Sequence, residues 1–510
     1  MLRLGTWSTH FTSRDLPESA EPAGYLRLPP AEWERWLDDL GIPDGTPYLL
    51  SPTFAYDVHL NSYFHRVDFL EGPLNSQNNR ASALARFLNF LHSNRGGKGW
   101  QDATEADHLA YHHWRRRDVR GPRVDGGTWS QEVSHLQQFY LHAVSKGWVS
   151  EVPIPQRAPR EWSGHQVPGP RRPEGQSVPA TYAHDEGGER IEWLPAASYR
   201  RWRDVGVRGY GLDGRPRAEF RGRWSERNAT FCDCMVRTGL RLSEQAHLVE
   251  WEVRTGPGPT GYSRFWLPGA IAKRHSAGWI YVPASVRRDL TDYAVHDRAA
   301  VVEEAQADGR YERIRRPLIV EDRARANTAR YTTGALAGRL VDVRLLGPAE
   351  RRRLLVETEA GLEPALFWLG EGGMPLAVST WKDMFTTANQ RCAELGLDLA
   401  AHAHLLRHTF AVITLEQLQR GHIAALGSLN LAQRLHYVRI FGDPLDWVRR
   451  RLRHASVLST LIYLHALQEL EMETRMALVP DSWEDVRDTA VNDLGDEDPP
   501  ADLVVAGVSG

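Results

Sequence analysis

The chain has 510 residues, of which 42% are hydrophobic and 25% charged, an ordinary composition for a soluble globular protein of two or three domains. No run of about 18 apolar residues occurs, so we expect no transmembrane helix, and the first residues lack the apolar core of a secretory signal. The three cysteines are too few for a disulfide framework and have no zinc spacing. The number and spacing of the cysteines indicate a protein of the reducing cytoplasm that binds no metal.

Charge is spread unevenly along the chain. The formal net charge of −3 alone argues against a nucleic-acid-binding protein. However, residues 481–510 contain nine acidic residues and one arginine, a net charge of −8, so the preceding 480 residues carry +5. A basic body can bind DNA through local patches whatever the total charge is.

The pattern at the N-terminal end predicts helices. Residues 1–70 form an extension of unknown role with one short helix over 32–37. Apolar residues then recur at helical spacing from residue 76, and further helices are expected over 106–116 and 128–146, the last with Thr128 as its N-cap. We therefore expect an all-helical domain over 71–152.

The rest of the chain divides by composition. Residues 153–190 are rich in Pro, Gly and Arg and are typical of a linker. Residues 191–478 mix helices with short strands, such as one over 279–283, and form the expected second domain. The acidic residues 479–510 are expected to be a disordered tail.

The first of four blocks that bear on chemistry is Thr-Gly-Leu-Arg-Leu-Ser-Glu, residues 238–244. Gly239 indicates a turn, and Arg241 falls at the start of a helix. Glu244 lies three residues further on, so it shares a helical face with Arg241. Taken alone, the two side chains are equally consistent with an ordinary surface ion pair.

The second block is a basic stretch before a strand. Lys273, Arg274 and His275 precede the strand over 279–282, which predicts a β-hairpin with a basic tip. A single lysine on a hairpin is usually only solvated, so this block gains meaning from the others.

The third block is His-Leu-Leu-Arg-His-Thr-Phe-Ala, residues 404–411. His404 and Arg407 share a helical face, which suits a grip on one anionic group. The alternative is a helix that merely carries polar residues on its exposed side.

The fourth block begins with a helix over 446–452 and ends at a tyrosine. Tyr463 follows His454 by nine residues. A lone tyrosine is most commonly a core residue. The basic side chains of this block that are available to DNA phosphates are Arg449, Arg450, Arg451 and Arg453.

In this order the four blocks resemble the tyrosine recombinase (phage integrase) family, over about residues 75–475. The resemblance implies a mostly α fold with a small antiparallel β-sheet. It comprises an N-terminal all-helical core-binding domain (SAM-like), which clamps DNA, and an α+β catalytic domain. Two insertions, near 292–362 and 416–446, lengthen the catalytic domain beyond the family pattern.

The resemblance also assigns roles residue by residue. Tyr463 matches the nucleophile. Lys273 matches the hairpin lysine, with Arg274 as the alternative and as a DNA contact. Arg453 departs from the pattern, since the family commonly has glycine there. The other matches are Arg241, Arg407, His404 and His454 as catalytic residues and Glu244 and His408 as supporting residues.

Chemistry explains why such residues belong together. Attack on a phosphodiester adds charge to the non-bridging oxygens, which Arg241 and Arg407 meet with permanent bidentate donors in place of a metal. A phenol has a pKa near 10, so Tyr463 needs a general base, for which His404 is the natural choice. Lys273 would protonate the leaving 5′ oxygen, and His454 would donate to a non-bridging oxygen.

The function implied is a site-specific recombinase or integrase of a mobile genetic element, acting through a 3′-phosphotyrosine without metal, cofactor or ATP. Its partners would be double-stranded DNA at attachment sites, other copies in a tetramer on DNA, and a directionality factor. The expected location is the cytoplasm, at the nucleoid, with no membrane. Open alternatives are a transposase or resolvase of the same chemistry, a type IB topoisomerase, and a non-catalytic DNA-binding protein with the same fold.

Overall fold

The computed structural model divides the chain into two compact units. Unit 1 comprises residues 1–188 and 243–380, and unit 2 comprises residues 189–242 and 381–510. The described residues are 5–14, 30–157, 178–183, 191–253, 262–321, 327–334, 336–427, 443–454, 456, 459–464 and 466–468. The acidic tail expected over 479–510 lies outside them, as does most of the linker expected over 153–190.

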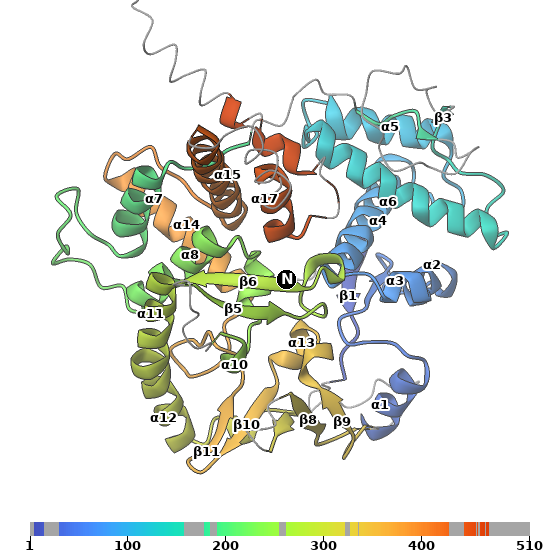
Figure 1. Ribbon diagram of the computed structural model, residues 1–510. Helices are drawn as coiled ribbons and strands as arrows, with labels where there is room; N and C mark the ends of the chain where they lie inside the picture. Colours follow the sequence, from blue (N-terminus) through green and yellow to red (C-terminus); the bar gives the residue numbers. More distant parts are fainter. Residues whose placement is uncertain are drawn as a thin grey trace, which may run out of the picture. The chain divides into compact units, whose positions relative to one another are not determined.

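The fold is mostly helical with small sheets, as predicted (Figure 1). In unit 1, the expected helices are α4 (Leu74–Asn94), α5 (Glu105–Arg116) and α6 (Gly126–Ser145). They enclose one aromatic-rich core that includes the fully buried Trp129. The predicted N-cap of α6 was wrong by three residues, because the Asp125 carboxylate accepts the Thr128 amide at 2.8 Å and so caps the helix.

The N-terminal residues of unit 1 add a short two-stranded sheet that packs beside α4. Strands β1 (Ser8–Phe11) and β2 (Pro47–Leu50) pair antiparallel. The short helix expected over 32–37 is α1 (Pro30–Asp39). The remaining elements of this half are α2 (Val58–Ser62), a 3-10 turn (Tyr63–His65), α3 (Val67–Leu70), β3 (Gln156–Arg157) and β4 (Val178–Pro179).

The predicted β-hairpin is present in unit 1. Strands β5 (Tyr262–Leu267) and β6 (Gly278–Pro283) pair antiparallel in continuous register. Side chains along β5 alternate between exposed and buried, so one face of the hairpin packs on the unit. Two short helices precede it, α9 (Leu242–Ala246) and α10 (Glu250–Val253).

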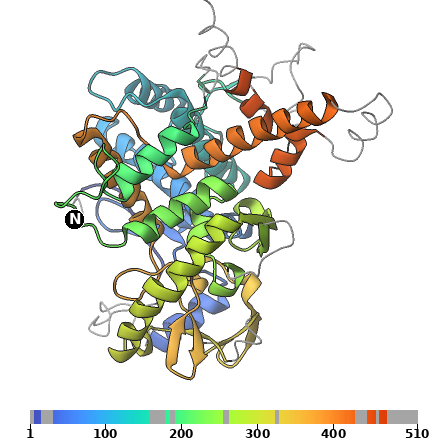
Figure 2. The same ribbon diagram turned by 60° about the vertical axis from the view of Figure 1, so that its left-hand side comes forward.

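The span predicted as an insertion near 292–362 forms a five-stranded sheet of its own, in the order β11-β10-β7-β8-β9. Strands β7 and β10 pair parallel and the other neighbours antiparallel, so this sheet is mixed. Helix α12 lies along β11 (Figures 1 and 2). The elements are α11 (Ala284–Tyr293), α12 (Ala299–Ala307), β7 (Leu318–Val320), β8 (Thr328–Tyr331), β9 (Leu340–Asp342), α13 (Pro348–Arg351), β10 (Leu354–Thr358) and β11 (Gly361–Pro364). A short π-helix lies at Ala294–Arg298, and 3-10 helices lie at Tyr311–Arg313 and Val343–Leu345.

The buried Arg351 side chain fastens this inserted sheet to the segment that follows the first sequence block. The Arg351 side chain is fully buried and pairs with Glu252 at 2.8 Å. It also donates to the main-chain oxygen of His247 at 3.0 Å. Because the Arg351 guanidinium is bonded to acceptors at both Glu252 and His247, it fixes the position of the inserted sheet relative to the segment 247–252.

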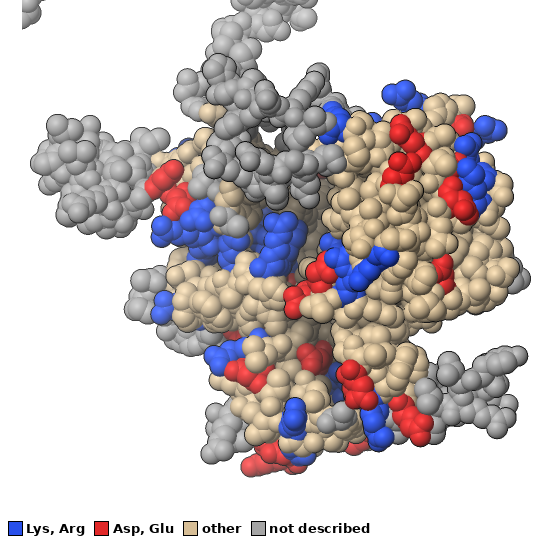
Figure 3. Space-filling model, turned by 90° about the vertical axis from the view of Figure 1, so that its right-hand side faces the viewer, with Lys and Arg blue, Asp and Glu red and all other residues tan. Residues whose placement is uncertain are grey.

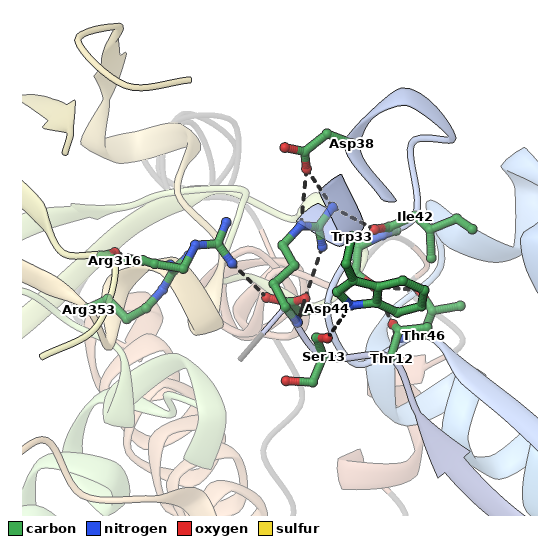
Figure 4. Close-up of polar contacts among 11 residues, drawn as sticks. Thr12, Ser13, Trp33, Asp38, Ile42, Asp44, Thr46, Arg316 and Arg353 are labelled. Carbon is green, nitrogen blue, oxygen red and sulfur yellow. Dashed lines mark hydrogen bonds and ion pairs between the residues drawn. The ribbon is translucent and has the colours of Figure 1, made fainter. Parts of the chain in front are cut away.

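The N-terminal extension reaches the inserted sheet as well (Figure 4). Arg14 donates to Asp38 at 2.7 Å and to Asp44 at 2.9 Å, and Asp44 in turn lies 3.5 Å from Arg316. Arg353 then donates to the main-chain oxygen of Arg316 at 3.1 Å. The two parts of the chain that the family resemblance left unassigned therefore contact each other.

Unit 2 is a group of helices in which α15 packs against both α8 and α17 (Figure 1). Its described helices are α7 (Ala196–Trp202), the π-helix Arg203–Val207, α8 (Ser225–Thr238), α14 (Val378–Glu394), α15 (Ala403–Gly427), α17 (Pro444–Leu452) and a final helical stretch over 459–464. Of the second predicted insertion, 416–446, the first part continues α15 and residues 428–442 lie outside the described residues. No described helix of either unit has the length and apolar content to cross a bilayer.

Candidate active site

Unit 2 brings together residues from three of the four sequence blocks. Arg407 of α15 is the centre of this arrangement, with its side chain 1% exposed. Its Nη1 donates to the main-chain oxygen of Gly239, just after α8, and its Nη2 donates to that of Leu452 at 2.5 Å, at the end of α17. One side chain therefore joins the first, third and fourth blocks.

Gly239 is needed for this contact on two grounds. Its φ of +69° lies in the left-handed region that favours glycine, where it ends α8. A Cβ placed there would lie 2.5 Å from the Phe410 ring. The turn expected at Gly239 thus serves close packing of α8 on α15, next to Arg407.

His454 is held on both sides of its backbone and on one ring nitrogen. Its amide donates to the Arg449 oxygen at 3.0 Å, and Arg449 Nη1 donates to the His454 oxygen at 3.1 Å. The Thr460 hydroxyl lies 3.1 Å from His454 Nδ1 and is fully buried. Thr460 was not identified from the sequence, where a lone threonine near the tyrosine gives no signal.

The predicted nucleophile lies inside the unit. Tyr463 is 2% exposed and packs in an apolar cluster with Phe410 and Leu452. Its hydroxyl lies 3.0 Å from Nδ1 of His408. Burial raises the pKa of Tyr463, and the charges of Arg407 and Arg241 act in the opposite direction.

Two of the histidines are neutral at physiological pH. Burial, followed by His404 and Arg407, lowers the pKa of His408 to about 4. Burial, followed by Arg407 and Arg241, lowers the pKa of His454 to about 4 as well. His404 is exposed, and its ring meets that of His408 edge-on with the centroids 4.4 Å apart.

Three of the predicted site residues, Glu244, Lys273 and Arg274, belong to unit 1. Lys273 is exposed at the tip of the hairpin, where Lys273–His275 forms a 3-10 turn. The Lys273 amide donates to a carboxylate oxygen of Glu244 at 3.4 Å, and Glu244 is fully buried. Arg274, the alternative to Lys273, is also exposed and has a φ of +54°.

The arginines predicted to contact DNA differ in what they do. Arg449 is turned inward, since it bonds both Asp446 at 2.7 Å and the His454 backbone. Arg450 also pairs with Asp446 but leaves 75% of its side chain exposed. Arg451 stacks over the Trp447 ring at 5.0 Å. Figure 3 shows Lys and Arg side chains gathered on one face, with Asp and Glu side chains beside them.

Other features of the described residues do not add to this cluster. No group of three or more His, Cys, Asp or Glu among them is arranged to hold a metal ion. A hollow of about 460 Å³ in unit 1 is lined by Tyr63, Arg66 and Arg80, among others, and by none of the predicted site residues.

Comparison with known proteins gives structural matches only. No family model matches the chain, and neither does any curated protein. Among solved structures, the chain is similar to the XerH site-specific recombinase bound to its palindromic difH substrate, with 13% identity and a TM-score of 0.42 over 80% of this chain and 81% of that one. It is also similar to the Tn1549 transposon integrase in complex with transposon right-end DNA, with 11% identity and a TM-score of 0.42 over 82% and 97%. A third is a lambda integrase dimer bound to a core site, with 12% identity and a TM-score of 0.37 over 78% and 88%. All three are named as recombinases or integrases, and their identity to this chain is 11–13%.

The backbone at Arg453 makes a stability prediction. Arg453 ends α17 at φ +56°, in the left-handed region, at a position where the recombinase pattern that the sequence resembles commonly has glycine. A left-handed non-glycine residue costs about 1 kcal/mol or more, so Arg453→Gly should raise the free energy of unfolding of unit 2 by about 1 kcal/mol. Urea denaturation measures the change. The matched control is Arg450→Gly inside α17, which should lower it by about 1 kcal/mol; a loss in both variants would contradict the argument.

The neutral histidines make stability depend on pH. Their pKa of about 4 in the folded chain lies below the unfolded value of 6.5, so the unfolded chain binds more protons between these limits. The stability that these two neutral histidines contribute is therefore fully present above pH 6.5 and is lost as the pH falls towards 4. Thermal unfolding at several pH values should show a shallower loss in the double variant His408→Asn, His454→Asn than in the wild type. Equal slopes would show that the two rings titrate normally.

Proposed function

We propose that this protein is a site-specific DNA recombinase of the tyrosine type, which cleaves and rejoins DNA through a 3′-phosphotyrosine. The observation that supports this most is the convergence in unit 2 of a buried tyrosine, a buried arginine and neutral histidines from separate sequence blocks. An ordinary core tyrosine does not need three ionisable neighbours, since burying them is costly.

The proposed chemistry divides into binding and proton transfer. Arg241 and Arg407 bind the non-bridging oxygens of the scissile phosphate and stabilise the charge that develops there. His454, oriented by Thr460, donates a further hydrogen bond to the phosphate. Tyr463 attacks phosphorus and Lys273 protonates the leaving 5′ oxygen. The phosphodiester energy is kept in the tyrosyl bond, so a second 5′ hydroxyl can reverse the step without ATP.

Partners and setting follow from this proposal. The helical domain over 71–152 would clamp the DNA against the catalytic domain, and four copies would assemble on two duplexes. Double-stranded attachment sites, in an element that moves between DNA molecules, are the proposed substrate, with a directionality factor as a further partner. The nucleoid is the proposed site of action.

The nucleophile can be tested without knowing the attachment site. Wild-type protein incubated with a pool of nicked duplexes of random sequence should retain DNA after denaturation, because a nick lets the cleaved strand diffuse away and traps the adduct. Mass spectrometry of the nuclease-digested protein should find the phosphate on Tyr463. Tyr463→Phe should retain no DNA under denaturing conditions while binding the same duplexes in a native gel.

The contrary outcomes separate the alternatives. Adducts in Tyr463→Phe would move the nucleophile elsewhere. Binding without any adduct from the wild type would favour a non-catalytic DNA-binding protein. Because two arginines take the place of a cation in the proposal, capture should persist in excess chelator, and rescue of a chelated reaction by magnesium would contradict that part.

The leaving-group proton makes the prediction for Lys273. On a captured sequence, Lys273→Ala should cleave about 10²- to 10⁴-fold more slowly than wild type, the usual contribution of a general acid. A substrate with a bridging 5′ sulfur has a leaving group that needs no proton, so the variant should recover on it. Arg274→Ala is the matched control and should respond equally to both substrates. If the recovery instead follows Arg274→Ala, the general acid is Arg274.

A further inference from the structure

The histidine within hydrogen-bonding distance of Tyr463, the predicted nucleophile, is His408. The sequence pattern had suggested His404 as the general base. The Tyr463 hydroxyl lies 3.0 Å from Nδ1 of His408, which is within hydrogen-bonding distance. The first histidine of the block, His404, lies one helical turn earlier on α15 and is exposed. A general base must lie within hydrogen-bonding distance of the proton that it takes, whatever its pKa is.

The environment of His408 keeps it in the form that accepts a proton. Its ring is mostly buried, and burial lowers its pKa to about 4, so it is neutral at physiological pH. A neutral imidazole with its proton on Nε2 leaves Nδ1 as an acceptor for the phenol. Three ionisable groups from the same part of the chain act on His408: His404 and Arg407 of α15, and His402 just before that helix. From other elements, His454 and Tyr463 face it as well.

The packing fixes this pair in place. Tyr463 lies in the apolar cluster with Phe410, two residues from His408, and α15 packs along α17. Thr409, next to His408, accepts the Leu194 amide at 2.9 Å and is fully buried, so the backbone at this point is held. The hydrogen bond is thus built into the interior of unit 2 and does not depend on a mobile surface side chain.

From this geometry we propose that His408 is the general base of the reaction, and that it takes the proton of Tyr463 as the phenol attacks phosphorus. The inference rests on the function proposed above. The Oη–H bond of Tyr463 breaks and an Nδ1–H bond forms on His408. In the same step the Oη–P bond forms while the P–O5′ bond breaks, and the 5′ oxygen takes its proton from Lys273. On religation, His408 returns its proton to Tyr463.

This assignment leaves His404 with a different task. In this proposal its exposed ring donates a hydrogen bond to the phosphate, while its contact with His408 adds to the effects that keep His408 neutral. The imidazolium that forms on His408 during attack is favoured by the negative charge that gathers on the phosphate in the same step. The transfer and the attack therefore belong together in one transition state.

The test compares three variants on a nicked duplex captured by the wild type from the random pool. His408→Asn keeps an oxygen that accepts the phenol hydrogen bond but has no ionisable nitrogen, whereas His408→Ala removes the contact. If His408 accepts the proton, both variants should cleave about 10²- to 10⁴-fold more slowly at neutral pH. Their rates should also rise about tenfold per pH unit towards the phenol pKa, because only ionised phenol then reacts. The wild type should be nearly independent of pH in this range.

The controls keep the outcomes distinct. His404→Ala should be slowed but keep the flat pH profile of the wild type, and His296→Asn, an exposed histidine of unit 1, should change nothing. A nearly wild-type rate in His408→Asn would overturn the inference and leave His408 a positioning residue. Acquisition of the pH slope by His404→Ala would overturn it in favour of His404. Absence of any wild-type adduct would instead contradict the proposed function itself, so the two failures are distinguishable.

An independent measurement requires no DNA. In protein labelled with ¹⁵N-histidine, the Nδ1 of His408 should resonate as an unprotonated nitrogen that accepts a hydrogen bond. Its shift should move in Tyr463→Phe. A protonated Nδ1 would mean that His408 donates to the tyrosine oxygen, and it would overturn the assignment.

Discussion

The candidate site depends on the hydrogen bonds of the Arg407 guanidinium to the backbone at Gly239 and Leu452. These bonds use two of its nitrogens to join α8, α15 and α17 at a single point. Because a buried charge is stable only when its donors are satisfied, the three segments must keep this arrangement for the unit to fold. The predicted catalytic arginine is therefore also the residue that positions its neighbours.

Several local features follow from that constraint. Gly239 is required where α8 ends beside Phe410, and the left-handed Arg453 ends α17 so that the Leu452 oxygen faces Arg407. His454 follows immediately and is fixed by Arg449 and Thr460. The strain at Arg453 is a local cost accepted for this geometry.

The sequence predicted most of the helices and the hairpin, because these elements produce a periodic pattern within a short stretch of the chain. Helical spacing identified α4, α5, α6 and α17, and the strand pattern identified the β5–β6 hairpin. The mixed sheet over 318–364 was not predicted, because its strands are only three to five residues long and pair across distant segments. The cap of α6 was misplaced because Asp125 and Thr128 are both good capping residues, and only the structure separates them.

For the site, the sequence identified the residue types but not their contacts. The His-x-x-Arg spacing places His404 and Arg407 on one face and suggests the first histidine as the base, since neighbours on a helix face are all that spacing reveals. The contact between His408 and Tyr463 joins residues 55 positions apart, which no local pattern encodes. The same applies to Thr460, which orients His454 through a side-chain contact.

Burial gives these contacts a common consequence. Tyr463 is almost fully enclosed, and the two histidines around it are neutral, so in the absence of DNA the unit holds a protonated phenol next to an uncharged imidazole. Because both groups are neutral and hydrogen-bonded to each other, burying the pair in an apolar cluster costs little free energy. A phosphate bound by Arg407 and Arg241 would change this balance, because its negative charge favours a cation on the neighbouring imidazole. The enclosed tyrosine would then become reactive in response to the substrate's own charge, so that phosphate binding and activation of the nucleophile become one event.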